Sequence, residues 1–342
     1  MKNLFALLCG LLWVSMAQAQ LQNTQVLNEP LDISADYSDY RNTFYLADEL
    51  VAFDPATGQG TLKYLRHNYA TRQAFNNTLS RLVPAEANEF PGTEYEASPE
   101  LPFAVQFVSD RTIRIKTTSG PQFQHPTSLM LVNGEVENHI ADWAYSAIDG
   151  GHRYTSPHGR VDIMVKPWHV NIYDAAGKLL TSTLHMTDVA NTYTPVAPFG
   201  YIRRASDYSR SMNAVFTLSP DEKIFGCGES FTEFNKRGQK VVLFTDDANG
   251  VQNETMYKPI PFYMSSRGYG VFMNTSTPIT IDFGKYFSMA NSMMIGDNEA
   301  DLFVFLGEPK DILDEYTDLT GKAAMPPLWS FGFWMSRITY FS

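Results

Sequence analysis

Short segments in which apolar and polar residues alternate recur through the middle of the chain. Residues 104–108 and 111–116 form one pair of such runs, residues 161–165 and 170–173 form another, and residues 212–218 add a fifth run. A period of two, with β-branched and aromatic residues and short intervening turns, is typical of antiparallel strands with one buried face. The pattern predicts a fold made mainly of β-strands.

Residues 224–274 are divided by glycines into runs that are too short for helices. The runs between these glycines are β-branched and aromatic, as at 241–245 and 271–274, which favours a series of hairpins. Such hairpins, with polar residues at their turns, commonly hold side chains over a cleft. The polar turn residues are Glu229, Lys236, Arg237, Asp246, Asp247 and Asn249. We expect the first three to form an ion-pair network that braces a turn.

A helix is predicted over residues 309–321, where apolar residues recur at i, i+1, i+4 and i+7 from Ile312. Pro309 suits the first turn, and Gly321 is expected to end the helix. A linker containing Pro326 and Pro327 follows, and then a nearly unbroken apolar run at 328–335. Such a run is typical of a strand that is buried on both faces in a parallel sheet.

The composition fits a β-rich protein and excludes some partners. The 342 residues include 13% aromatic and 18% charged residues, and the formal net charge is −11. Nucleic acid and anionic membranes repel an acidic chain, so we expect neither as a partner. The seven histidines are scattered without the spacing of a metal site, and no glycine-rich phosphate loop follows a strand. We therefore expect no cofactor.

Residues 1–19 have the features of a signal peptide. Lys2 precedes an apolar run at 4–14, and Ala17 and Ala19 form a small-residue cleavage site. The run is short for a membrane span, although an uncleaved anchor helix is the alternative. Cleavage would leave Cys227 as a lone cysteine, which excludes an intramolecular disulfide. We expect export to a bacterial periplasm or beyond, and no transmembrane span in the mature chain.

Four motifs in order resemble the N-terminal β-sandwich of glycoside hydrolase family 31, which consists of retaining α-glycosidases. They are GCGESF at 226–231, NKRGQ at 235–239, TDDANG at 245–250 and YKPIPFYMSSRGYGVFMN at 257–274. The sequence from 321 to 342 resembles the entry into the family's catalytic (β/α)8 barrel. The resemblance implies a large antiparallel, galactose mutarotase-like β-sandwich. Its implied units are a signal peptide (1–19), the sandwich (20–307), a connector helix and linker (308–322), and the first strand of an incomplete barrel (323–342).

The resemblance also places the catalytic residues outside this chain. Retaining glycosidases use two carboxylates about 5 Å apart, one as nucleophile and one as acid/base. In the family both lie on later barrel strands, beyond residue 342, so we assign no catalytic residue here. Since one strand cannot close a barrel, we expect the chain to be a fragment of a longer protein.

Two residues are candidates for substrate binding by resemblance. Asp247 matches an acid that the family's N-terminal domain presents to the sugar next to the cleaved one, and a carboxylate can accept two hydroxyl hydrogen bonds. Alternatively, Asp247 shapes a turn with its polar neighbours. Ile338 matches a barrel-strand residue that contacts the sugar in the main pocket, where some α-glucosidases have tyrosine; core packing is the alternative.

Together these features predict an exported α-glycosidase that acts on terminal α-linked sugars of oligosaccharides. The SRITYF ending resembles α-xylosidase-like bacterial members of the family, which ranks α-xylosidase first and α-glucosidase second. A non-catalytic carbohydrate-binding sandwich is the rival hypothesis, although such a module has no reason to continue into a buried parallel strand. Besides the substrate, the expected partner of the sandwich is its own catalytic barrel.

Overall fold

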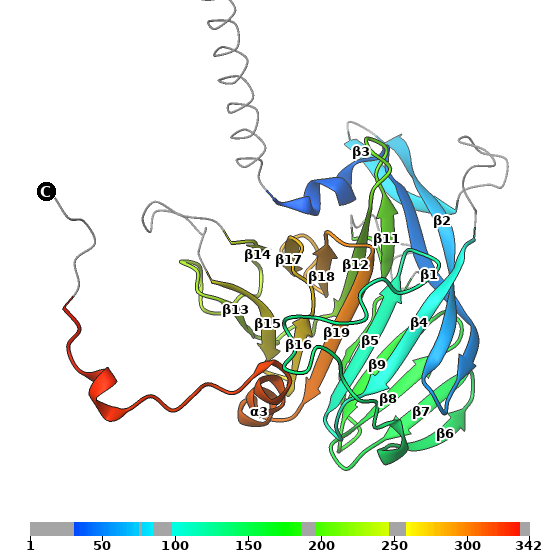
Figure 1. The fold of residues 1–342 in the computed structure, drawn as a ribbon. Coiled ribbons are helices and arrows are strands. Elements are labelled where there is room, and N and C mark those ends of the chain that lie inside the picture. The colour runs from blue at the N-terminus through cyan, green and yellow to red at the C-terminus, as the bar shows by residue number, and fades with distance from the viewer. Residues whose placement is uncertain (1–30, 75–76, 85–97, 186–195, 246–257, 336–342) are drawn as a thin grey trace, which may run out of the picture.

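The computed structural model describes residues 31–74, 77–84, 98–185, 196–245 and 258–335. Within these ranges the chain forms two antiparallel β-sheets, and an α-helix lies near the C-terminal end (Figure 1). The predicted mainly β, antiparallel architecture is therefore confirmed.

The larger sheet has 14 strands and contains most of the chain. Its order is β13-β15-β16-β19-β5-β4-β2-β1-β11-β12-β18-β17-β14, and β3 pairs with β2 beside this path. The strands are β1 (Thr43–Asp54), β2 (Gln59–Ala74), β3 (Asn77–Pro84), β4 (Glu100–Phe107), β5 (Thr112–Thr118), β11 (Gly200–Arg203), β12 (Arg210–Thr217), β13 (Ile224–Gly228), β14 (Lys240–Leu243), β15 (Pro259–Ser265), β16 (Tyr269–Met273), β17 (Ile279–Phe283), β18 (Ala290–Ile295) and β19 (Glu299–Leu306).

The smaller sheet is a meander of five consecutive strands. They are β6 (Ala144–Ile148), β7 (Gly151–Thr155), β8 (Gly159–Met164), β9 (His169–Asp174) and β10 (Leu179–Ser182). The strand pair predicted around 161–173 is β8 and β9, in which Val161 lies opposite Ile172. The inward residues of this sheet, with Trp168 beside them, join the inner face of the large sheet in one core.

Alternation along β19 explains how one strand serves two hydrophobic layers. Leu302 and Val304 point into the core between the sheets, whereas Phe303 and Phe305 point to the opposite face. All four side chains are buried. Because successive side chains of a strand point to opposite faces, the second layer needs its own cover.

Helix α3 (Pro309–Thr320) provides this cover and confirms the predicted helix. The Asp311 carboxylate accepts a hydrogen bond from the Glu308 backbone N–H at 3.0 Å, which caps the N-terminal end. Ile312 is fully buried against the aromatic layer, and the Tyr316 ring stacks on Phe262 with centroids 4.2 Å apart. Figure 1 shows α3 lying beside β15 and β16.

The strand predicted over 328–335 is wrong for this structure. Leu328–Phe331 form a short 3-10 helix, η4, and residues 332–335 have no regular structure. The side chains of this segment are exposed, for example Phe333 at 93%. A buried parallel strand needs a hydrogen-bonded neighbour on each side, and within the described residues no strand pairs with this segment.

Candidate functional site

The two ends of the large sheet approach each other near residues 243–245 and 258–259, which flank segment 246–257 in the chain and are called its base. Cys227 of β13, Val241 of β14 and Pro259 of β15 line one small cavity, although β13 and β14 end the strand order on opposite sides. Segment 246–257 connects the end of β14 to the start of β15. Asp247 belongs to this segment, so it lies outside the described residues, and Ile338 does too.

The GCGESF motif forms a strand that packs unusually close to β15. Cys227 has a positive φ of 70°, between Gly226 and Gly228 at 130° and 80°. A Cβ on Gly228 would lie 2.1 Å from the carbonyl oxygen of Lys258, closer than any side chain allows. Glycine is therefore required by both conformation and space, and it lets the backbone approach the base of segment 246–257.

A buried carboxylate fixes the start of this strand. Glu222 is 1% exposed and accepts hydrogen bonds from Ser265 Oγ at 2.5 Å, Tyr269 Oη at 2.6 Å and the Ser219 backbone N–H at 2.9 Å. Burial, together with the nearby Tyr263 and Glu222, raises the pKa of Tyr269 well above its usual value, so Tyr269 remains a donor. The network joins the turn before β13 to β15 and β16.

The expected ion-pair network of Glu229, Lys236 and Arg237 is wrong in its pairing. Lys236 is buried and donates hydrogen bonds to hydroxyl groups, including Thr232 Oγ1 at 2.5 Å. Arg237 donates to backbone carbonyls, including that of Ser219 at 2.7 Å. Glu229 instead lies 3.5 Å from the exposed ammonium group of Lys258. Both cations still brace the turn, but through neutral oxygen acceptors.

A second cleft, of about 270 Å³, adjoins the same base. It is lined by Phe244 and Thr245 at the end of β14, by Pro261 of β15, and by the loop hydroxyls of Ser276 and Thr277. Hydroxyl groups beside apolar surface suit a neutral polar ligand better than a charged one.

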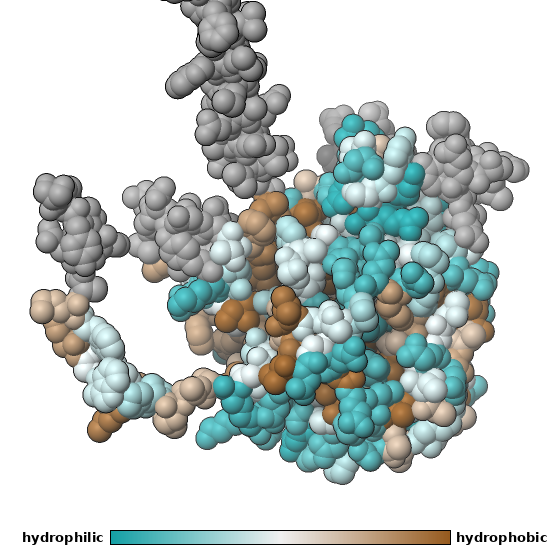
Figure 2. All heavy atoms as spheres, viewed as in Figure 1, coloured by the Kyte–Doolittle hydropathy of each residue, from teal (hydrophilic) through white to brown (hydrophobic). Residues whose placement is uncertain are grey.

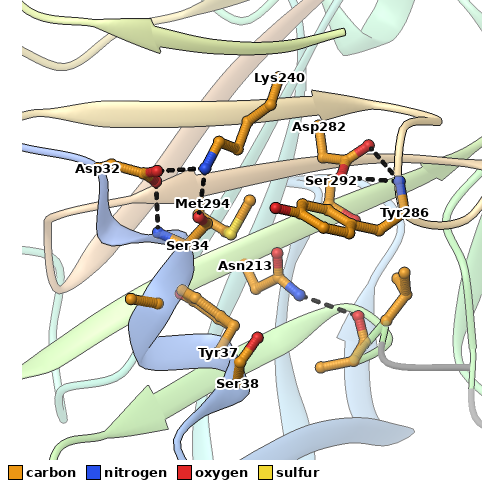
Figure 3. Close-up of a pocket in the computed structure, with 13 residues that line it drawn as sticks. Asp32, Ser34, Tyr37, Ser38, Asn213, Lys240, Asp282, Tyr286, Ser292 and Met294 are labelled. Atoms are coloured by element: carbon orange, nitrogen blue, oxygen red, sulfur yellow. Dashed lines mark hydrogen bonds and ion pairs between the residues drawn. The ribbon is translucent and has the colours of Figure 1, made fainter. Parts of the chain in front are cut away.

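A cavity of about 470 Å³ lies under the 3-10 helix η1 (Ile33–Ser38). Figure 3 shows η1 on one side and Lys240, Asp282 and Tyr286 on the other. Lys240 forms an ion pair with Asp32 and donates a hydrogen bond to Ser34 Oγ at 3.2 Å. Burial alone would raise the pKa of Asp32, but hydrogen bonds from Lys240 and Ser34 outweigh it and lower the pKa.

Asp282 contributes a buried carboxylate to the same cavity. It is 4% exposed and accepts backbone hydrogen bonds from Lys285 at 2.6 Å and Tyr286 at 3.2 Å. Burial raises its pKa, while these backbone donors act in the opposite direction. The backbone thus occupies much of the acceptor capacity of this carboxylate.

The described residues include side chains of metal-ligand types and one cysteine, Cys227. No group of three or more His, Cys, Asp or Glu side chains in this part of the chain could hold a metal ion. Cys227 is a free, buried cysteine, and burial raises the pKa of its thiol to about 12. Among the residues that the structure describes, no helix is both long and apolar enough to cross a membrane.

The family follows from a match over residues 102–282. This region fits the model described as the glycosyl hydrolase 31 N-terminal galactose mutarotase-like domain, which covers more than half of the chain. The chain belongs to glycosyl hydrolase family 31. The family resemblance predicted from the glycine-rich motifs is thereby confirmed, and the antiparallel sheets are those of this galactose mutarotase-like domain.

Relatives of the chain are family 31 glycoside hydrolases. An alpha-xylosidase from Emericella nidulans is 41% identical over 124 residues, which are 36% of this chain and 16% of that protein. Alpha-glucosidase 2 from Bacillus thermoamyloliquefaciens is 28% identical over 197 residues, 54% of this chain and 22% of that protein. The chain thus spans about a sixth to a fifth of the length of these relatives.

The solved structure of a family 31 dextranase from Flavobacterium johnsoniae, complexed with glucose, has the same fold. The TM-score is 0.58 at 21% identity, and the alignment covers 84% of this chain and 30% of that one. The alignment therefore extends well beyond the region matched by the family model.

Sequence reasoning missed the cavity under η1. Its lining comes from residues 32–38, from β12 and from the strands around 240, 282 and 292, which are far apart in the chain. The sequence around each polar residue of these strands does not predict a cavity, because a single polar residue is also common in an ordinary strand.

Proposed function

We propose that this chain is the N-terminal part of an exported retaining α-glycosidase that removes terminal α-linked xylose from oligosaccharides, with glucose as the second choice of sugar. The observation that carries the preference is the identity of 41% to an alpha-xylosidase, against 28% to an alpha-glucosidase over a longer alignment. The nucleophile and the acid/base belong to barrel sequence beyond residue 342, so the chain alone is inactive.

Within this enzyme, Asp247 and Ile338 contact the substrate. The support for Asp247 is its place in the sequence, two residues after Thr245, which lines the cleft of about 270 Å³ together with hydroxyl and apolar side chains. A carboxylate can accept two hydroxyl hydrogen bonds from one sugar. Ile338, in the motif that follows the apolar run, contributes apolar surface to the pocket of the cleaved sugar.

The sandwich packs against the catalytic barrel through the C-terminal arm, residues 322–335. Figure 2 shows this arm extending from the body with hydrophobic side chains along it. Met325, Leu328, Phe333 and Met335 are each at least 88% exposed. Contiguous exposed apolar residues mark an interaction surface. Because the chain belongs to family 31, the catalytic barrel is the partner that we propose for this surface.

Export rests on the features of residues 1–19, which lie outside the described residues. Mass spectrometry of the protein from a bacterial periplasmic fraction tests it. We expect a mature N-terminus at Gln20, and retention of Met1 would refute the signal peptide.

Release of an aryl leaving group from aryl α-xyloside and aryl α-glucoside tests the activity. The comparison is between this chain and the same chain extended through a complete barrel. We expect activity in the extended protein alone, with the xyloside preferred. Activity of the 342-residue chain would show that its own carboxylates catalyse, and inactivity of both proteins would favour a carbohydrate-binding module.

In the extended protein, Asp247→Asn is expected to raise KM for an oligosaccharide more than for an aryl monoglycoside, since Asp247 is proposed to contact the sugar beyond the cleaved one. Asp246→Asn is the matched control. An equal effect of the two substitutions would favour the turn-shaping role.

A further inference from the structure

A row of side chains across the large sheet leaves a hollow on its outer face. Val105 and Ile115 point into the core between the two sheets, so their neighbours Ala104 and Lys116 point to the opposite face. Ala104 of β4 lies opposite Gln59 of β2 on one side and opposite Lys116 of β5 on the other. Its methyl group fills little of the space between these two long side chains, and all three residues line a pocket of about 220 Å³.

The segment that follows β5 adds to the lining of this pocket. Phe123, Pro126 and Val136 contribute apolar surface, and Glu135 contributes an exposed carboxylate. The Lys116 ammonium group lies 4.7 Å from the centroid of the Phe123 ring. The volume is below the range of about 300–1,000 Å³ that is usual for drug-sized ligands, so the pocket suits a ligand no larger than about one sugar ring.

Lys116 is a buried cation with few acceptors. It is 8% exposed, and its ammonium group donates to the carbonyl oxygen of His125 at 3.4 Å. The nearest oxygen of Glu299 is 3.9 Å away, which is too far for a hydrogen bond. Burial lowers the pKa of Lys116, because the neighbouring carboxylates do not fully offset the loss of water. Since an ammonium group has three donors, Lys116 can still donate to a ligand in the pocket.

Arg114 turns a second donor toward the same pocket. Its Nη1 donates to Gln106 Oε1 at 3.1 Å, across the β4–β5 pair. Because a guanidinium group only donates, this contact identifies the amide oxygen of Gln106, and the Nε2 donors face away from Arg114. They have no acceptor within the part of the chain that the structure describes. Arg114 itself is balanced by Asp301, at 2.7 Å and 2.6 Å.

We propose that this pocket binds a small ligand that carries a carboxylate on a hydroxylated ring, as a uronic acid unit does. The carboxylate accepts from the Lys116 ammonium group and from Gln106 Nε2, and the ring lies against Phe123. The exposed amide of Gln59 can both donate to and accept from ring hydroxyls. Charge-assisted hydrogen bonds are about twice as strong as neutral ones, so the acid is preferred to a neutral sugar. The site is separate from the proposed hydrolysis, whose carboxylates are expected beyond residue 342.

Titration of the 342-residue chain, followed by calorimetry and NMR, tests the site with three probes. Methyl α-D-glucuronide carries the carboxylate, methyl α-D-glucoside has the same ring with a neutral hydroxymethyl group, and acetate is a carboxylate without a ring. We expect about millimolar binding of the glucuronide and at least tenfold weaker binding of the other two. Absence of glucuronide binding, or equal binding of the glucoside or of acetate, would overturn the proposal.

Three substitutions test the residues of the pocket. Lys116→Met keeps the apolar stem without the charge and should raise Kd for the glucuronide about tenfold or more. Gln106→Glu still offers Arg114 an acceptor but replaces the donor with a negative charge, so it should raise Kd by at least as much. Glu135→Gln removes an exposed charge that repels the ligand and should instead lower Kd, by about twofold.

Lys178→Met is the matched control, because it removes an exposed positive charge outside the lining of this pocket. Its Kd should equal that of the parent chain. An unchanged Kd in Gln106→Glu, or a higher Kd in Glu135→Gln, would contradict the proposed contacts. If Lys116→Met does not fold, these two variants decide, since they are expected to act in opposite directions. Because the assay needs no catalysis, its result is independent of the activity test.

Discussion

Asp301 of β19 is the partner of a buried cation, so its removal gives a well-defined test of the fold. Its carboxylate accepts from Arg114 Nε at 2.7 Å and Arg114 Nη2 at 2.6 Å, across the β5–β19 pair. The two side chains are only 7% and 9% exposed. Asn274 Nδ2 donates to the same carboxylate at 2.7 Å. Asp301→Ala would therefore leave a guanidinium and an amide without this acceptor.

The magnitude follows from this burial. With charge centres about 4 Å apart and an effective dielectric constant of about 20, the lost attraction is about 4 kcal/mol. Breaking a buried pair from one side typically lowers the free energy of unfolding by about 3–5 kcal/mol. Total stabilities are about 5–15 kcal/mol, so Asp301→Ala removes a large fraction of the stability.

Urea denaturation followed by tryptophan fluorescence measures the effect. Arg114→Met combined with Asp301→Leu should lose less stability than Asp301→Ala, because no charge remains buried and unpaired. Arg41→Ala is the surface control: it removes an ion pair of the same 2.6 Å distance whose arginine is 81% exposed, and the midpoint should not move. A loss below about 1 kcal/mol in Asp301→Ala, or a double variant no more stable than it, would refute the reasoning.

Three further predictions concern the backbone, pH and thiol chemistry. Gly238→Ala, at φ 80° with open space around it, should lose about 1–2 kcal/mol, and Gly228→Ala, at the same φ against a carbonyl, should lose more in thermal unfolding. Equal losses would contradict the close approach. The lowered pKa of Asp32 stabilises the fold above pH 3.8, and this contribution disappears as pH falls through the lower folded value; the Tm difference from Asp32→Asn should therefore shrink in acid. A constant difference would exclude the linkage. Cys227, with a thiol pKa near 12, should resist thiol reagents at pH 8 until the chain is denatured, as peptide mapping would reveal; rapid labelling of the folded protein would contradict its burial.

The sequence predicted the elements whose pattern is local. The paired strands β4 and β5, the pair β8 and β9, and helix α3 lie where period-two and helical spacing place them. The glycine-containing motifs also predicted the family. Gly226 and Gly228 have backbone conformations and close contacts that other residues cannot accommodate. Such features are set by backbone conformation within a few residues, so they can be read without knowing the partners.

Predictions that depended on a partner were less successful. The apolar run 328–335 has the composition of a buried strand, but composition does not provide the neighbouring strands that a parallel sheet requires. Likewise, sequence spacing suggested that Glu229 would pair with Lys236 and Arg237, whereas the fold turns both cations toward hydroxyl and carbonyl oxygens.

The β-rich class, the positions of local elements and the family can be predicted from the sequence, because they depend on periodicity and on residues with special backbone requirements. Three relations become visible only in the folded chain: the large sheet brings β13 and β14 together, α3 covers the outer aromatic layer, and Lys240, Asp282 and Tyr286 share one cavity with η1. These relations join residues that are distant in the chain. They are set by packing and strand order, which leave no local pattern.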